Sequence, residues 1–146
     1  MIDFGGRRGM LASMKRGLML VWCMLGLGCG SGSAPQIVTI APPEPNVLET
    51  NQQTKTVVNL GVTDPDGDLA ELIVELIDPA EQRGQTTVDI RAQAGSANNA
   101  SVGLVLTLVP QAVGVYRIVV RAADEAGNQS APMETTLTAQ EPPPPQ

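Results

Sequence analysis

Histidine is absent from this sequence, and cysteine and aromatic residues are scarce. The 146 residues include no His, two Cys and one each of Trp, Tyr and Phe. Without His, a Ser-His-Asp triad, a Cys-His pair and a His-ligated metal are excluded. Basic residues are also few, since nine Lys and Arg stand against 15 Asp and Glu, a net charge of −6. This balance argues against nucleic acid as a partner, and the length fits roughly one domain.

The N-terminal segment has the features of a targeting signal. Lys15 and Arg16 precede an apolar run of 12 residues, Gly17–Gly28. As a helix this run is about 18 Å long, short of the roughly 30 Å hydrocarbon core. We therefore predict a signal peptide over residues 1–28 rather than a spanning helix. Met14 is a more ordinary start than Met1, so residues 1–13 are either an upstream start-site artefact or a long n-region.

The end of this segment, Leu25-Gly-Leu-Gly-Cys29, resembles the lipobox of bacterial lipoproteins, although Gly26 stands where that family prefers Leu. The resemblance implies cleavage before Cys29, a lipid on its thiol and a place in the bacterial cell envelope, at the outer membrane or facing the periplasm. Residues 29–35 then form the lipidated cysteine and a flexible linker. The chain from Cys29 onward has five basic and 14 acidic residues, a net charge of −9. The alternative is a plain cleaved signal with an incidental cysteine.

From residue 36 to residue 140 the chain has the strand-and-turn pattern of an all-β domain. Alternating runs of Val, Ile, Leu and Thr are separated by clusters of Gly, Pro, Asp and Asn. We expect strands at Ile37–Ile40, Thr54–Thr63, Leu69–Ile77, Thr86–Ala92, Ser101–Val109, Val115–Ala123 and Met133–Ala139. Seven strands in about 105 residues predict a seven-stranded antiparallel immunoglobulin-like Greek-key sandwich. Residues 141–146 form a Pro-rich tail, for which we expect an extended conformation.

The segment Gly114-Val-Tyr116 opens the sixth expected strand. A tyrosine at this place in a sandwich forms a tyrosine corner, in which the phenol bonds to the backbone of the preceding turn. We therefore assign structural roles to Gly114 and Tyr116. The run from Gly114 to Asn128 has Gly-x-Tyr, alternating apolar residues and Asp-x-Ala-Gly-Asn. It resembles bacterial immunoglobulin-like and fibronectin-like repeats, which include calcium-binding, cadherin-like members.

Two acidic loops carry the main candidate site. Asp64, Asp66 and Asp68 alternate in the turn between the second and third expected strands. Carboxylates spaced in this way point into a small volume, which suits an oxygen-preferring cation such as Ca²⁺. In this fold the loop of residues 124–128 lies at the same end of the sandwich, and it brings further acidic residues to this pole. The resemblance to calcium-binding repeats implies Asp64, Asp66, Asp68 and Asp124 as the ligands.

The same two loops also fit a reading without a metal. Asp-Pro-Asp-Gly and Glu-Ala-Gly-Asn are good turn sequences, in which Asp accepts backbone hydrogen bonds and Gly67 and Gly127 supply positive φ. The sequence is compatible with both readings, so calcium is an expected cofactor of one of them.

These patterns suggest two candidate functions and argue against a third. The leading one is a non-enzymatic, lipid-anchored envelope module for surface interaction, adhesion or scaffolding, with the membrane and an envelope protein or surface ligand as partners. The alternative is a structural module stabilised by Ca²⁺ between the 64–68 and 124–128 loops. Paired carboxylates also occur in glycosidases. However, Tyr116, the one aromatic residue after Cys29, is expected in the core, so we expect no sugar-binding cleft and predict no enzymatic activity.

Overall fold

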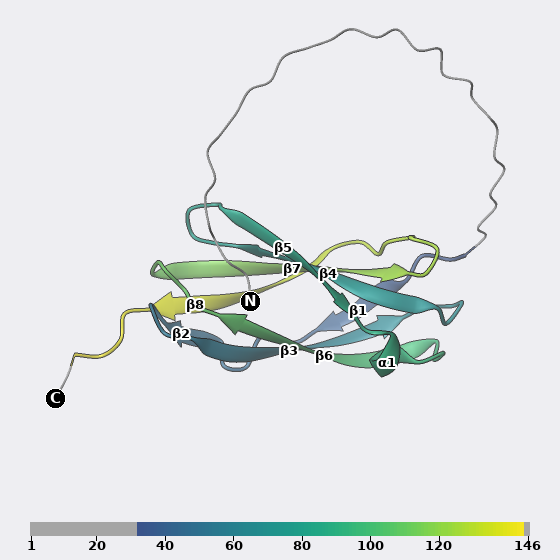
Figure 1. The fold of residues 1–146 in the computed structure, drawn as a ribbon, viewed down its shortest axis with the longest axis horizontal. Coiled ribbons are helices and arrows are strands. Elements are labelled where there is room, and N and C mark those ends of the chain that lie inside the picture. The colour runs from purple at the N-terminus through teal and green to yellow at the C-terminus, as the bar shows by residue number, and fades with distance from the viewer. Residues whose placement is uncertain (1–31, 145–146) are drawn as a thin grey trace, which may run out of the picture.

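The computed structural model describes residues 32–144, which form two packed β-sheets (Figure 1). The elements are β1 (Gln36–Ile40), β2 (Val47–Glu49), β3 (Thr54–Thr63), β4 (Leu69–Ile77), β5 (Arg83–Asp89), α1 (Arg91–Ala94), β6 (Asn99–Leu108), β7 (Gly114–Asp124) and β8 (Met133–Gln140). The predicted signal peptide, Cys29 and the last two residues of the tail lie outside the described residues. No helix in the described range is long and apolar enough to cross a membrane.

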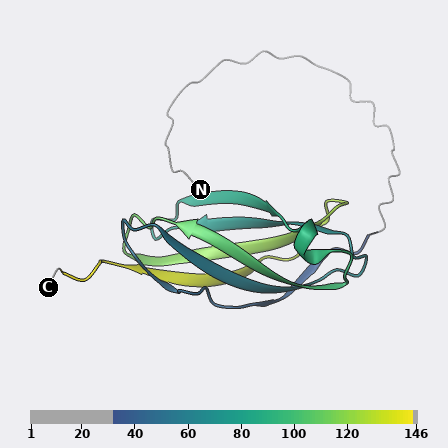
Figure 2. The same ribbon diagram turned by 60° about the horizontal axis from the view of Figure 1, so that its bottom comes forward.

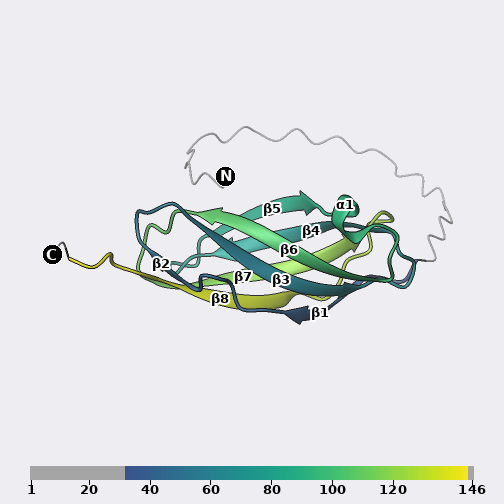
Figure 3. The same cartoon turned by 90° about the horizontal axis from the view of Figure 1, so that it is seen from below.

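The two sheets have three and five strands. The smaller sheet has the order β1-β3-β6, and the larger has the order β2-β8-β7-β4-β5. Successive strands β3 and β4 lie in different sheets, and so do β6 and β7, so the chain crosses repeatedly between the layers (Figure 3). All pairings are antiparallel except that of β2 with β8, which is parallel. The predicted all-β sandwich is confirmed, with mostly antiparallel sheets.

Two elements differ from the sequence prediction. Residues 32–144 contain eight strands rather than seven, because Val47–Glu49 forms the short strand β2 beside β8. Three residues are too few to show an alternating pattern. The expected strand Thr86–Ala92 instead runs from Arg83 to Asp89 and is followed by α1. The Asp89 carboxylate accepts hydrogen bonds from both the backbone N–H and the guanidinium of Arg91, and this local turn ends the strand.

Aliphatic side chains from both sheets fill the core. Alternate residues of β3 and β6 point inward, and the inward residues of β4 and β7 meet them from the other sheet. The fully buried large side chains are Leu48, Leu60, Leu72, Ile90, Ile118, Leu137, Val58, Val62, Val74, Val102, Val120 and Thr56. Tyr116, the one aromatic residue in residues 32–144, also belongs to the core and is 6% exposed. Stability therefore depends on close aliphatic packing.

The two ends of the sandwich carry different segments. In all three views the described chain begins at the end where α1 lies, and the C-terminal tail leaves at the opposite end (Figures 1–3). Figure 2 shows α1 at this end, in the connection from β5 to β6. A backbone hydrogen bond of 2.8 Å from the Asp64 N–H to the Asn98 carbonyl joins the β3–β4 loop to the segment after α1. The Asp64–Asp68 loop therefore shares an end with the N-terminal linker.

We expect Ile118→Ala to lower the free energy of unfolding by about 3 kcal/mol, because it leaves a cavity between the sheets. Ile118 is fully buried in the centre of β7. Val115→Ala is the matched control on the same strand, since Val115 is 54% exposed, and we expect it to change stability by less than about 0.5 kcal/mol. Denaturant titration measures both, and equal losses for the two variants would contradict this core.

Candidate metal centre

The β3–β4 loop is folded around the carboxylate of Asp64. This side chain is 1% exposed, and its two oxygens accept the backbone N–H groups of Asp66 at 3.3 Å and Asp68 at 3.0 Å. The Asp64 carbonyl also accepts the Gly67 N–H at 3.2 Å, with Gly67 at a φ of +70°. An Asp that bonds to the backbone after it holds a tight turn without any ion. The local sequence thus fixes the loop shape and turns the neighbouring carboxylates toward one another.

Three carboxylates meet in this loop. One oxygen from each of Asp64, Asp66 and Asp68 lies within 4.8 Å of the others. Asp64 is buried, Asp68 is partly buried and Asp66 is exposed. Like charges at this separation repel, and the repulsion grows as water is excluded. The cluster could hold a metal ion, and its all-oxygen donor set favours a hard cation such as Ca²⁺ or Mg²⁺.

Asp68 has a buried oxygen atom without a partner and a raised pKa. Its Oδ1 atom is buried and has no hydrogen-bond partner. Loss of water around the side chain, followed by the negative charge of Asp64, raises the pKa of Asp68 above its usual value of 3.8; Asp124 adds a smaller effect in the same direction. Buried polar atoms in proteins nearly always have a partner. The unpartnered oxygen therefore marks a position where a positive charge would be stabilised.

The second acidic loop lies against the first, as the fold predicted. The Glu125 N–H donates to the Asp68 carbonyl at 3.0 Å, so the β7–β8 loop is bonded directly to the β3–β4 loop. Asp124 is 4% exposed, and its oxygens accept the backbone N–H of Asn128 at 2.8 Å and the side-chain amide of Asn128 at 2.7 Å. It lies beside the group of three carboxylates and caps its own loop. Glu125 points elsewhere and pairs with Arg91 at 3.4 Å.

Two further segments at this pole carried no sequence signal. Asn98, in the connection between α1 and β6, donates from its side chain to the Pro65 carbonyl at 3.0 Å. The Ser33 N–H donates to Oδ2 of Asp66. A Cβ on Gly32 would lie 3.3 Å from both Asp66 Oδ2 and the Asn128 side-chain nitrogen. Position 32 therefore has little room for a side chain. The linker before β1 is thus held against the acidic cluster.

Tyr116 and Gly114 lie in the opposite half of β7 and serve the fold. The Tyr116 hydroxyl donates to the Ala112 carbonyl at 3.1 Å and accepts the Ala112 N–H at 3.2 Å, which is the geometry of a tyrosine corner. Gly114 has a φ of +141°, and a Cβ there would lie 2.8 Å from Cγ of Pro79. Both the backbone conformation and the close approach therefore require glycine.

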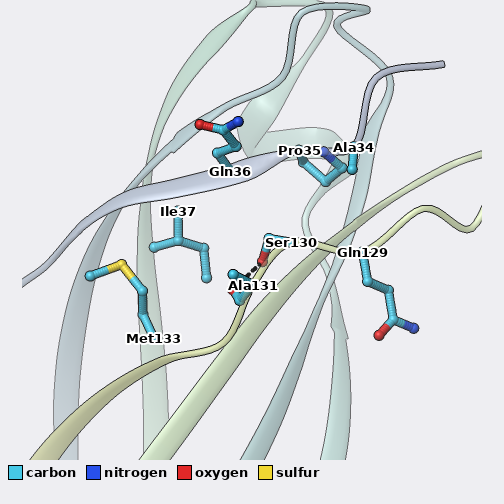
Figure 4. Close-up of a pocket in the computed structure, with 8 residues that line it drawn as sticks. All are labelled: Ala34, Pro35, Gln36, Ile37, Gln129, Ser130, Ala131 and Met133. Atoms are coloured by element: carbon cyan, nitrogen blue, oxygen red, sulfur yellow. Dashed lines mark hydrogen bonds between the residues drawn. The ribbon is translucent and has the colours of Figure 1, made fainter.

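An uncharged pocket of about 300 Å³ lies between the start of β1 and the segment before β8 (Figure 4). Its lining residues are Ala34, Pro35, Gln36, Ile37, Gln129, Ser130, Ala131 and Met133. The Ser130 hydroxyl accepts the Ala122 N–H and donates to the Ala131 carbonyl, so it is already satisfied. The pocket has no titratable side chain, and it offers no acid, base or metal ligand.

We expect Asp68→Asn to raise the melting temperature at pH 7 in EDTA. The pKa of Asp68 is raised in the folded state, so stability is highest below the unfolded value of 3.8 and falls as the pH rises through the raised pKa. The gain of the variant should therefore shrink toward pH 3, where the wild-type carboxyl is protonated. Glu141→Gln, in the exposed tail, removes one charge elsewhere and should show no such trend. A gain independent of pH would contradict this origin.

Comparisons with known proteins identify the fold. Neither a protein-family model nor a curated protein matches the sequence. Among solved structures, the PKD domain of an M14-like peptidase from a Thermoplasmatales archaeon is similar, with a TM-score of 0.52 and 17% identity, over 75% of this chain and 99% of that domain. A Niemann-Pick type C2 protein from the Japanese carpenter ant (TM-score 0.45, 8% identity, 77% and 96% coverage) and a superoxide reductase from Ignicoccus hospitalis (0.43, 11%, 75% and 82%) also match. The chain thus contains an immunoglobulin-like, PKD-like β-sandwich.

Proposed function

We propose that this chain is a non-enzymatic, lipid-anchored module of the bacterial cell envelope that serves surface interaction, adhesion or scaffolding. The observation that carries the proposal is the placement of the two ends of the described chain. The linker leaves the sandwich at the end that carries Asp64, Asp66, Asp68 and Asp124, which we call the acidic pole. The C-terminal tail leaves at the opposite end (Figure 1). An anchor on one side and a free far pole are what a tethered interaction module needs.

The linker also sets how close the sandwich would lie to a membrane. Ser33 is bonded to Asp66, and Cys29 is only three residues before Gly32. Three extended residues span about 10 Å. A lipid on Cys29 would therefore hold the acidic pole near the headgroups and would present the far loops and the tail outward.

The chemistry of the described residues supports a binding role rather than catalysis. The sequence has no histidine, so neither a Ser-His-Asp triad nor a Cys-His pair can form. The similar PKD domain is a domain of an M14-like peptidase. We infer a comparable accessory role for this chain, with an envelope protein or surface ligand as its partner.

Lipidation is tested by labelling with an alkyne analogue of palmitate in a bacterium that expresses the full chain. We expect label on the wild type and on Cys23→Ser, and none on Cys29→Ser, since acylation requires the thiol of the lipobox residue. Cys23 is the matched control because it is the other cysteine of the chain and lies in the apolar run directly before Cys29. Label retained on Cys29→Ser would contradict the anchor.

A second function, a calcium-stabilised module, is favoured by the unpartnered Oδ1 of Asp68. In this proposal Ca²⁺ binds at Asp64, Asp66 and Asp68 between the two acidic loops, with Asp124 beside them. The ion would reverse the sign of the repulsion among these carboxylates. It would also bind Asp66, which holds Ser33, so occupancy of the pole would act on the linker as well. Extracellular calcium modules bind with dissociation constants of about 10⁻⁴–10⁻³ M.

Thermal melts of the full chain in EDTA, CaCl₂ and MgCl₂ test the calcium site. At ten times the dissociation constant, Ca²⁺ should stabilise the fold by about 1.4 kcal/mol, which is a shift of several degrees. Asp66→Ala should abolish the shift because it removes a ligand. Glu125→Gln is the matched control, since Glu125 lies at the same pole but pairs with Arg91, and it should keep the shift. Equal loss in both variants would indicate general charge screening instead.

A further inference from the structure

The sandwich has four sheet edges, and three of them are protected. β1 has five residues and an irregular register between Ile37 and Thr39. β2 has three residues and ends in Glu49. β5 begins and ends with charged residues, Arg83 and Asp89, and both are in ion pairs. Short strands, bulges and charges are the devices that stop an edge from pairing with another chain.

The fourth edge, β6, has none of these devices. Its ten residues, Asn-Ala-Ser-Val-Gly-Leu-Val-Leu-Thr-Leu, include no charge and no proline. Its register with β3 is unbroken from Leu108 to Asn99, so no bulge interrupts the strand. It pairs with β3 alone (Figure 3), and α1 packs beside it near one end. Half of its backbone N–H and C=O groups point away from β3 along the remaining length.

The outer face beside this edge is also nearly free of charge. The outward residues of β3 and β6 are Lys55, Val57, Asn59, Gly61, Thr63, Asn99, Ser101, Gly103, Val105 and Thr107. Lys55 is the one charged residue among them, and Val105 is 59% exposed. The outer face of the larger sheet instead carries ion pairs such as Arg117 with Glu81 and Arg83 with Glu75. Because the chain after residue 28 has a net charge of −9, two copies meet with least repulsion along β6.

We propose that β6 pairs antiparallel with β6 of a second copy of this chain, giving a continuous six-stranded sheet of order β1-β3-β6-β6-β3-β1. With a two-fold axis, the free backbone groups of each β6 pair with those of the other copy. No unpaired β6 edge is left for a third copy, so the assembly closes as a dimer. No charge faces another across the pair in any register, because the strand carries none. The other three edges are protected, which disfavours a filament. This inference depends on neither the lipid nor the metal.

Gly103 is the residue best placed to test the pairing. A two-fold axis at Gly103, near the middle of the strand, pairs residues 101–105 of the two copies and leaves the strand end beside α1 unpaired. Gly103 is exposed, and a Cβ there would meet only Asn59 Oδ1 at 3.6 Å, an ordinary contact. Side chains at this position are therefore accommodated by the monomer. In the dimer, the two copies of residue 103 would lie about 5–7 Å apart.

Sedimentation equilibrium of the full chain in density-matched nonionic detergent with EDTA measures the association. We expect a reversible monomer–dimer equilibrium for the wild type. Gly103→Glu and Gly103→Lys should each raise the dissociation constant at least about tenfold, because like charges then face each other across the axis. Gly103→Thr, which suits a strand and adds no charge, should keep the dimer. Val115→Glu adds the same charge as Gly103→Glu at a valine of the other sheet that is 54% exposed. It should change the dissociation constant less than about threefold.

The outcomes distinguish association through the β6 edge from a general effect of net charge on association. In a net-negative chain, a general effect would make Gly103→Lys associate more tightly, whereas the proposed pairing weakens with either sign. Thermal melts of each variant check that the fold is retained. A wild type that is monomeric up to about 0.2 mM, an assembly larger than a dimer, or equal weakening by Val115→Glu and Gly103→Glu would each overturn the proposal.

Discussion

Burial of aliphatic side chains between the two sheets is the interaction on which the rest of this structure depends. The described residues contain one aromatic side chain, and Tyr116 fixes a turn as well as filling space. No disulfide or large aromatic group can compensate for loose packing here, so β3, β4, β6 and β7 must alternate cleanly. This packing sets which strands neighbour each other, and it thereby decides which loops meet at each pole.

The acidic pole is a consequence of that packing. The β3–β4 and β7–β8 loops meet because β4 and β7 are neighbours with Leu69 opposite Asp124. Each loop satisfies its own turn through one buried carboxylate, Asp64 in one and Asp124 in the other. Asp68 is left with a buried oxygen and a raised pKa, and Asp66 contacts the linker. The same residues therefore define a turn, a candidate cation site and an attachment point for the linker.

Charge is distributed unevenly over the two sheets. The larger sheet places Arg and Glu outward in pairs, whereas the smaller sheet presents valine, threonine, glycine and asparagine. Exposed ion pairs add little stability, but they keep a face and an edge soluble. Where they are missing, along β6, backbone groups and uncharged side chains are left for another strand. The acidic excess elsewhere makes this edge the natural place for contact between copies.

The sequence by itself determined the sandwich, most strand positions and the acidic residues of the two loops, because period-two alternation and Asp/Gly turns are local signals. The expected first and last residues of β3 and β4 agree with the structure, because each strand alternates over nine or ten positions. Only the tertiary structure decided the parallel β2–β8 pair, the hydrogen bond from Ser33 to Asp66 and the open edge of β6. Each of these joins residues far apart in the chain or depends on which strands remain unpaired, and no local pattern records that.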